Sequence, residues 1–381
     1  MTDDEQRRHT GHHLSRRAFL GASTTAAVAL AGCLEGSDDP RDGGDGSASD
    51  GGAAGTAPSR PGVANPPEAV YLPSHQEPMQ MVPPVEAGDY RVSLMLSFPH
   101  RFWLITGTER EEVSVDSGDV HLMATVQDTE TGTVVPVDTG AQFRVTQAGN
   151  LVDRRAPWPM ISQRMGFHFG DNVELSGYGT YSVEFDVTPL TGVKRTRGFE
   201  GRFEQRETVA FEFTFDEETE RELVTDVTFF EEDQWGKRDA IPPMGTDDSG
   251  TSMPYSQLPA ASTYPGRAVG TPSSGDAAFV VRYLEDDELA GGERGYLLVS
   301  PRTPYNRVPL PDMALSVTGA VEGELTQTLD SELGHHYGIP AALSPGAELE
   351  IRIETPPQVA RHRGYDTAFL DMPPLEVRVP E

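Results

Sequence analysis

The sequence predicts an all-β protein with two tandem β-sandwich domains that follow a flexible N-terminal tether. No segment shows helical periodicity over ten or more residues, whereas short runs of alternating apolar residues, separated by Gly-rich or polar turns, recur along the chain. A segment rich in Pro, Gly and Ser at 228–270 divides these runs into two groups. Short strands at this spacing are typical of antiparallel sandwiches.

Residues 1–33 are expected to be an export signal. Arg16 and Arg17 precede a short apolar stretch that ends at Cys33, which is the pattern of a twin-arginine signal. The stretch is too short for a good membrane span. Its end, Leu-Ala-Gly-Cys, resembles a lipobox, so we expect Cys33 to be the lipid anchor. The alternative is an ordinary signal that contains a cysteine by chance. Because Cys33 is the only cysteine, no intrachain disulfide can form.

The net charge of −30 arises from 60 acidic and 30 basic residues. This balance resembles the surfaces of salt-loving archaeal proteins, which stay soluble in concentrated salt. Such a surface disfavours nucleic acid, so we expect no nucleic-acid partner. We therefore interpret the charge as an adaptation to a salty solvent, and it says little about which ligand the protein binds.

The predicted domains follow in order along the chain. Residues 34–66 contain almost no bulky apolar side chains and should form a disordered tether. The first sandwich is expected at 67–227, with strands at 90–98, 120–128, 141–147, 180–189 and 208–216. After the linker at 228–270, the second sandwich is expected at 271–381, with strands at 276–284, 295–301, 313–321, 348–357 and 375–380.

Two similar runs suggest an internal duplication. "GFHFG" (166–170) and "GHHYG" (334–338) each place a histidine beside an aromatic residue and between glycines, ahead of an alternating strand. An Arg-Gly-aromatic segment then follows at a similar distance in both halves, at 197–199 and 363–365. Matched elements in the same order indicate one fold unit used twice. We expect His168 to lie in a turn beside the glycines.

Histidine and methionine are the residues from which a metal site would be built. Met160 and Met165 precede His168, and Met79 and Met81 follow His75. Imidazole with thioether is a soft, neutral ligand set that suits copper, especially Cu(I), and accepts ferrous iron when a carboxylate is added. A single cysteine excludes Cys-based zinc and iron–sulfur sites.

Three other histidines leave alternatives open. His121 lies inside a predicted strand and is expected to be an ordinary strand residue. His75 is either a ligand or a solvated residue of a Pro-rich segment, and His100 is either a ligand or a polar cap over Trp103.

The segment from "WPM" to "DVTP" (158–189) resembles the bacterial periplasmic iron-transport family. The Pro-Met pair at 159–160, "HFG" at 168–170, Asn172 and "GYGTYSVEFDVTP" follow the family's signature, and the resemblance covers roughly 70–216. The resemblance implies small immunoglobulin-like sandwiches that bind copper or iron, often dimerise and work with membrane iron permeases. It also implies Met160 and His168 as ligands, and His100 as the histidine at the end of the first core strand.

Two departures from the family leave each half with a partial site. The spacing from Met160 to His168 is one residue longer, so Met165 competes for the role. The family's later histidine falls at Thr196 in the first half, whereas "VARHRGYD" supplies His362 in the second half beside His336. Either the ligands meet across an intrachain pseudo-dimer, or one half has only a structural role.

These observations predict a lipid-anchored protein on the extracellular face of the cell membrane that binds copper or iron and supports iron uptake. The predicted ligands are His100, Met160 and His168, with His336 and His362 as a second set. The predicted partners are a membrane iron permease and either a second copy of the chain or the chain's own second half. No catalytic motif stands out, so we expect no enzyme activity. The alternative is a metal-free adhesion or protein-interaction lipoprotein.

Overall fold

The computed structural model describes residues 61–115, 118–244, 254–285, 288–291 and 294–381. All of these residues belong to one compact unit. The predicted export signal, Cys33 and most of the predicted tether lie outside the described residues. Within the described residues, no helix is long and apolar enough to cross a membrane.

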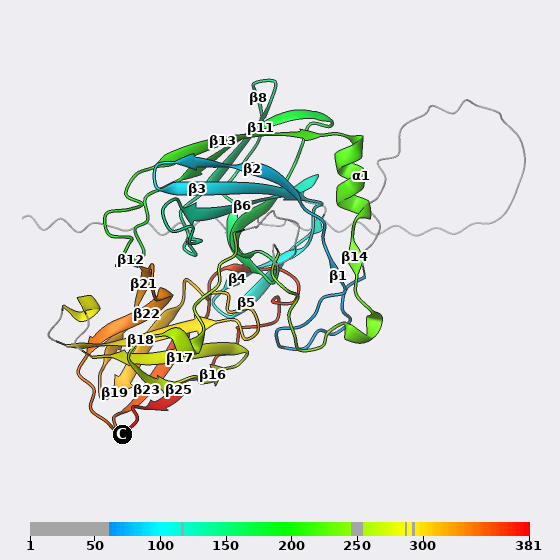
Figure 1. Cartoon of the computed structure of the whole chain (residues 1–381). Helices are drawn as coiled ribbons and strands as arrows, with labels where there is room; N and C mark the ends of the chain where they lie inside the picture. Colours follow the sequence, from blue (N-terminus) through cyan, green and yellow to red (C-terminus); the bar gives the residue numbers. More distant parts are fainter. Residues whose placement is uncertain (1–60, 116–117, 245–253, 286–287, 292–293) are drawn as a thin grey trace, which may run out of the picture. The chain divides into compact units, whose positions relative to one another are not determined.

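The prediction of an all-β chain is confirmed, and the sheets pack in pairs (Figure 1). The first pair joins an eight-stranded sheet, ordered β2-β3-β6-β10-β9-β24-β4-β5, to a four-stranded sheet, ordered β13-β11-β7-β8. Strand β13 contacts β2 and β3, which brings the two sheets face to face. The strands of this pair are β2 (Gln80–Ala87), β3 (Tyr90–Ser97), β4 (Phe102–Thr106), β5 (Glu109–Val113), β6 (Val120–Asp128), β7 (Gln142–Gln147), β8 (Asn150–Arg155), β9 (Trp158–Ser162), β10 (Gly166–Val173), β11 (Gly179–Val187), β13 (Glu207–Phe215) and β24 (Ala360–Arg361).

The second pair contains a seven-stranded sheet and another four-stranded sheet. The larger sheet runs β12-β21-β22-β18-β17-β15, with β16 also on β17, and the smaller runs β20-β19-β23-β25. Their strands are β12 (Lys194–Arg195), β15 (Arg267–Gly270), β16 (Ser273–Ser274), β17 (Ala277–Leu284), β18 (Gly295–Arg302), β19 (Ala314–Gly319), β20 (Gly323–Glu324), β21 (Thr326–Asp330), β22 (Gly334–Ala341), β23 (Glu348–Thr355) and β25 (Leu375–Arg378).

The remaining described elements are short. Strands β1 (His75–Gln76) and β14 (Thr228–Phe229) form a two-stranded sheet. Helix α1 (Glu217–Thr225) begins at Asp216, whose side chain accepts a hydrogen bond from the Thr219 amide. Three 3₁₀ turns complete the set: η2 (Glu232–Gln234), η3 (Ala261–Thr263) and η4 (Glu288–Ala290).

The strand patterns follow from which faces are covered. Strands β11 and β13 alternate between buried and more exposed residues, because one face of their sheet packs on the core and the other faces outward. Every residue of β10 is buried, so this strand shows no alternation. Residues 166–170 are therefore a central strand, and the expectation that His168 lies in a turn was wrong.

The two halves exchange one short strand each. Strand β24, from the second half, lies between β9 and β4 in the first half's sheet and pairs in parallel with β9. Strand β12, from the first half, pairs in parallel with β21 in the second half's sheet. Ala360 is opposite Met160, and Lys194 is opposite Thr328. The exchange therefore brings residues of the second half into the first half's sheet, and the reverse.

Candidate metal centre

The centre of interest is built on strand β10 and its neighbours. His168 is directly opposite Met160 on β9, so the two side chains lie on the same face of the sheet. Strand β6 pairs with the other edge of β10 and places His121 opposite Asn172. His100 lies in the segment between β3 and β4.

His362 reaches this group through the exchanged strand. It directly follows β24, and its amide donates to the Ile161 carbonyl of β9 at 3.2 Å. The group of His100, His121, Met160, His168 and His362 is called the first centre below. Met160, His121 and His168 are fully buried, His100 is nearly so, and His362 is partly exposed.

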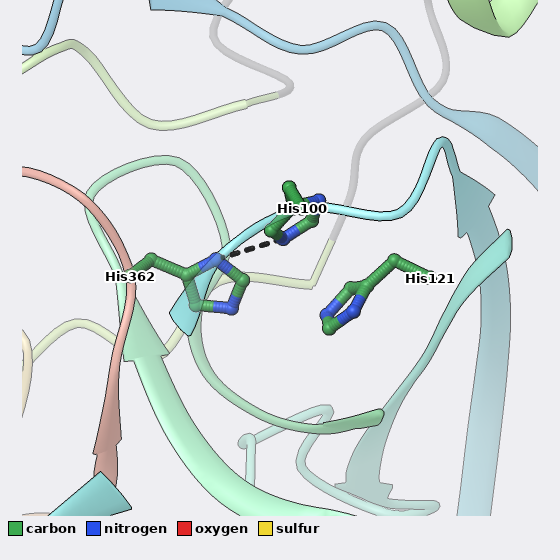
Figure 2. Close-up of side chains that lie close together, drawn as sticks. All are labelled: His100, His121 and His362. Atoms are coloured by element: carbon green, nitrogen blue, oxygen red, sulfur yellow. Dashed lines mark hydrogen bonds between the residues drawn. The ribbon is translucent and has the colours of Figure 1, made fainter. Parts of the chain in front are cut away.

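The donor atoms of the first centre converge around the His362 ring. His362 Nδ1 lies 3.1 Å from His100 Nε2, and His362 Nε2 lies 3.1 Å from His168 Nε2 and 3.2 Å from Met160 Sδ. Ring nitrogens of His100, His121 and His362 all lie within 4.8 Å of one another. Figure 2 shows these three rings turned toward a common point, with the contact between His100 and His362 dashed.

Hydrogen bonds to the outer nitrogens fix three of the rings. His100 Nδ1 donates to the Phe98 carbonyl and His168 Nδ1 to the Gly166 carbonyl, each at 3.1 Å. Asn172 donates its amide hydrogens to the His100 and Ser114 carbonyls, which leaves Asn172 Oδ1 to accept from His121 Nδ1 at 2.8 Å. Each of these three rings therefore presents an Nε2 lone pair to the centre.

Burial keeps these imidazoles neutral. It lowers the pKa of His121 to about 3 and that of His168 to about 4. Burial and the neighbouring imidazoles lower the pKa values of His100 and His362 well below the usual range. Neutral imidazole is the form that binds a metal ion.

The neutral imidazoles of the first centre have too few N–H groups to make every contact between their nitrogens a hydrogen bond. A neutral His362 has one N–H, so it can donate to His100 or to His168, and the other contact then joins two lone pairs. His121 Nε2 is also buried, with no hydrogen-bond partner among the described residues. Buried lone pairs without donors are costly. An imidazole binds a given ion through one nitrogen, so an ion on His362 Nε2 would take up the facing lone pair of His168 and the Met160 thioether, while His362 Nδ1–H donates to His100 Nε2. Ligand atoms about 2 Å from one ion are about 3 Å from each other. The donor set thus fits a metal ion.

A small cavity leads to the first centre. Its volume is about 30 Å³, and its lining includes His100, His362, Met123 and Met165. His75 also lines this cavity, but it contacts Ser74, Glu77 and Arg363. Met165 packs with Met95 and Met123 in a cluster of methionine side chains. Met160, and not Met165, is therefore the methionine whose sulfur contacts a histidine of the first centre.

His336 lies elsewhere, in a second centre formed by Thr196, Tyr296, Thr328 and His336. His336 is opposite Thr328, as His168 is opposite Met160. His336 Nδ1 donates to the Gly334 carbonyl at 3.0 Å, and its Nε2 is 3.3 Å from the Tyr296 hydroxyl. The expectation that His336 and His362 form a second ligand set does not match this geometry, because strand exchange places His362 in the first centre.

His121 is the residue that sequence reasoning missed. It was expected to be an ordinary strand residue, and it does lie in β6. Val120, Leu122 and Ala124 of this strand join the main core, which turns His121 and Met123 to the opposite face. The spacing of His121 and Met123, which places both on the face opposite the core residues, was the sequence feature that could have indicated this site.

Comparisons with known proteins are consistent with this organisation. Residues 108–217 match the family model described as Fe2+ transport protein, and residues 262–378 match a family described as a domain of unknown function (DUF7350). No curated protein matches the chain. The first half is therefore similar to the Fe2+ transport family over the matched segment, which contains His121, Met160 and His168.

Two solved structures that are similar to part of this chain are of copper-bound proteins. A copper-bound variant of FetP from uropathogenic Escherichia coli strain F11 is 20% identical, with a TM-score of 0.29, and the match covers 36% of this chain and 97% of that one. A copper-bound variant of P19 from Campylobacter jejuni is 16% identical, with a TM-score of 0.28, and the match covers 36% of this chain and 97% of that one.

Proposed function

We propose that this chain binds copper or iron outside the cell membrane, at the first centre, and supports iron uptake by a membrane iron permease. The proposed ligands are His100, His121, Met160, His168 and His362. The observation behind the proposal is the convergence of three fixed Nε2 lone pairs and a thioether on a neutral His362 ring. The match of residues 108–217 to the Fe2+ transport family supports the same role.

The ion is the cargo in this proposal, and the protein's task is to hold and release it. Four imidazoles and a thioether supply neutral donors. Hydrogen bonds that three of the rings donate to the Phe98 and Gly166 carbonyls and to Asn172 Oδ1 hold those rings in the required tautomer. The cavity beside His362 gives the ion a route between the centre and solvent. Lipid anchoring at Cys33, which lies outside the described residues, would keep the protein near the permease.

We further propose that the chain needs no second copy to complete its centre, because the strand exchange occurs within one chain. The first half contributes His100, His121, Met160 and His168, and the second half contributes His362. The chain is then an intrachain pseudo-dimer, with one complete centre in place of two.

The test is metal analysis of the purified full-length chain after loading with Cu(I), Cu(II) or Fe(II) under anaerobic conditions. We expect one ion per chain and a loss of binding in His168→Ala. The equivalent change in the second centre, His336→Ala, is the matched control and should leave binding unchanged. Failure of all three ions to bind would contradict the proposal and favour a metal-free interaction protein.

A further inference from the structure

We infer that the first centre selects Cu(I) over Fe(II) and Cu(II), because every donor that meets there is neutral and none is a carboxylate. The inference rests on the proposed function and states which of its two candidate metals the same site prefers. Thioether and imidazole are ligands that Cu(I) accepts readily, whereas oxygen ligands favour harder ions.

No carboxylate joins the first centre within the described part of the chain. Among the described histidine, aspartate and glutamate side chains, only histidines bring their ligand atoms together there. Asp171 is next to Asn172 but turns away, with Oδ1 accepting from the backbone N–H of Asn172 and lying 4.0 Å from Arg155 Nη1. Glu77 lines the entrance cavity, where its carboxylate is 3.6 Å from His75.

The charged side chains that line the entrance cavity are mainly positive, with three arginines against Glu77. Arg101, Arg164 and Arg363 all line the entrance cavity, in a chain whose acidic residues outnumber its basic ones by two to one. The desolvation cost of an ion rises with the square of its charge, and only nearby opposite charge offsets it. A monovalent ion is therefore favoured here over a divalent one.

The position of Met123 offers a direct way to change this preference. A Cβ placed on Gly170 would lie 2.8 Å from Met160 Sδ, 2.9 Å from His121 Nε2 and 3.4 Å from Met123 Cγ. Met123 therefore borders the same point as two proposed ligands, and it is 1% exposed. A glutamate at 123 has a similar length and would bring a carboxylate to that point.

The experiment compares the wild-type full-length chain with Met123→Glu and Met123→Leu. Affinities for Cu(I) and Fe(II) are measured anaerobically by competition with chromophoric chelators, and the reduction potential of the bound copper is measured in the same samples. In the wild type, Cu(I) should bind at least about 1,000-fold more tightly than Fe(II). Met123→Glu should lower the ratio of Cu(I) to Cu(II) affinity by about 100-fold, which is about 120 mV for a one-electron couple.

Met123→Leu controls for packing, since it changes neither charge nor approximate volume, and should keep the wild-type preference. Fe(II) binding within about tenfold of Cu(I) in the wild type would overturn the inference and leave the proposed function intact. An unchanged potential in a folded, copper-loaded Met123→Glu would also overturn it. Absence of binding by every ion would instead defeat the proposed function.

Discussion

The first and second centres have equivalent backbone arrangements, but the side chains around their central histidines differ. In each, an exchanged strand pairs in parallel with its neighbour, and the next residue donates its amide to an equivalent carbonyl: His362 to Ile161 at 3.2 Å, and Thr196 to Leu329 at 3.0 Å. The central histidines, His168 and His336, also bond to equivalent glycine carbonyls. Fold and strand exchange are therefore common to both centres and cannot by themselves account for the metal binding proposed for the first.

The difference lies in the side chains that surround the central histidine. By strand register, Tyr296 stands where the first centre has His121, and Thr328 stands where it has Met160. The Tyr296 hydroxyl lies 3.3 Å from His336 Nε2, so it can donate to the lone pair that a metal would use. At the exchanged position, Thr196 Oγ1 donates to Asp330 Oδ2 at 2.8 Å. The second centre thus satisfies its polar groups with hydrogen bonds, whereas the first centre leaves lone pairs without donors.

The change with the largest expected effect is His362→Thr. It places in the first centre the residue type that the second centre has at the equivalent position, Thr196. Loss of one of the proposed ligands should weaken Cu(I) binding by more than about 100-fold, because the effect of an inner ligand exceeds the 10–100-fold typical of outer partners. The affinity is measured by chelator competition on the full-length chain. Thr196→Val, which alters the equivalent position of the second centre, should bind Cu(I) as the wild type does. Equal losses in both variants would show that the exchanged strand matters for folding and not as a source of a ligand.

Strand positions could be predicted from the sequence, because one-sided burial gives alternation in strands such as β11 and β13. The positions of Met160 on β9 and His168 on β10 as candidate ligands could also be predicted, since both lie in a recognisable local motif. The location of His362 could not, because it depends on a two-residue strand that pairs with the other half of the chain. His121 was obscured for a related reason: both faces of β6 are buried, so the sequence does not show which face borders a site.

A smaller effect should appear in the pH dependence of the second centre. Burial lowers the pKa of His336 to about 4, against about 6.5 in an unfolded chain. Between these values the unfolded state binds a proton that the folded state does not, so the free energy of unfolding falls as the pH falls from 6.5 towards 4. His336→Gln keeps a donor and an acceptor but cannot titrate. It should reduce this slope by up to about 1.4 kcal/mol per pH unit.

The measurement is urea unfolding of the metal-free chain at several pH values between 4.5 and 7, for wild type and His336→Gln. Because the two centres are independent in this comparison, His336→Gln should bind Cu(I) with wild-type affinity at pH 7. An unchanged slope would mean that His336 is not held neutral in the folded chain, and the two centres would then differ in protonation as well as in composition.

The smallest expected effect concerns a hydrogen bond of Thr196, which occupies in the second centre the position that His362 occupies in the first. Thr196→Val removes the Oγ1 donor to Asp330 but keeps the shape of the side chain. Asp330 is fully buried, and it retains the bond from Arg197 Nε at 3.0 Å and those from the Glu332 and Leu333 amides, each at 2.9 Å. The loss should therefore stay at about 1.5 kcal/mol, the lower end of the range for a hydrogen bond to a charged group, and not reach the larger penalty of an unpaired buried charge. Urea unfolding at pH 7 measures it, with Thr196→Ser, which keeps the hydroxyl, as the control. A loss of several kcal/mol in Thr196→Ser, with little loss in Thr196→Val, would indicate that the packing of the threonine methyl group, and not its hydrogen bond, holds β12 in the second sheet.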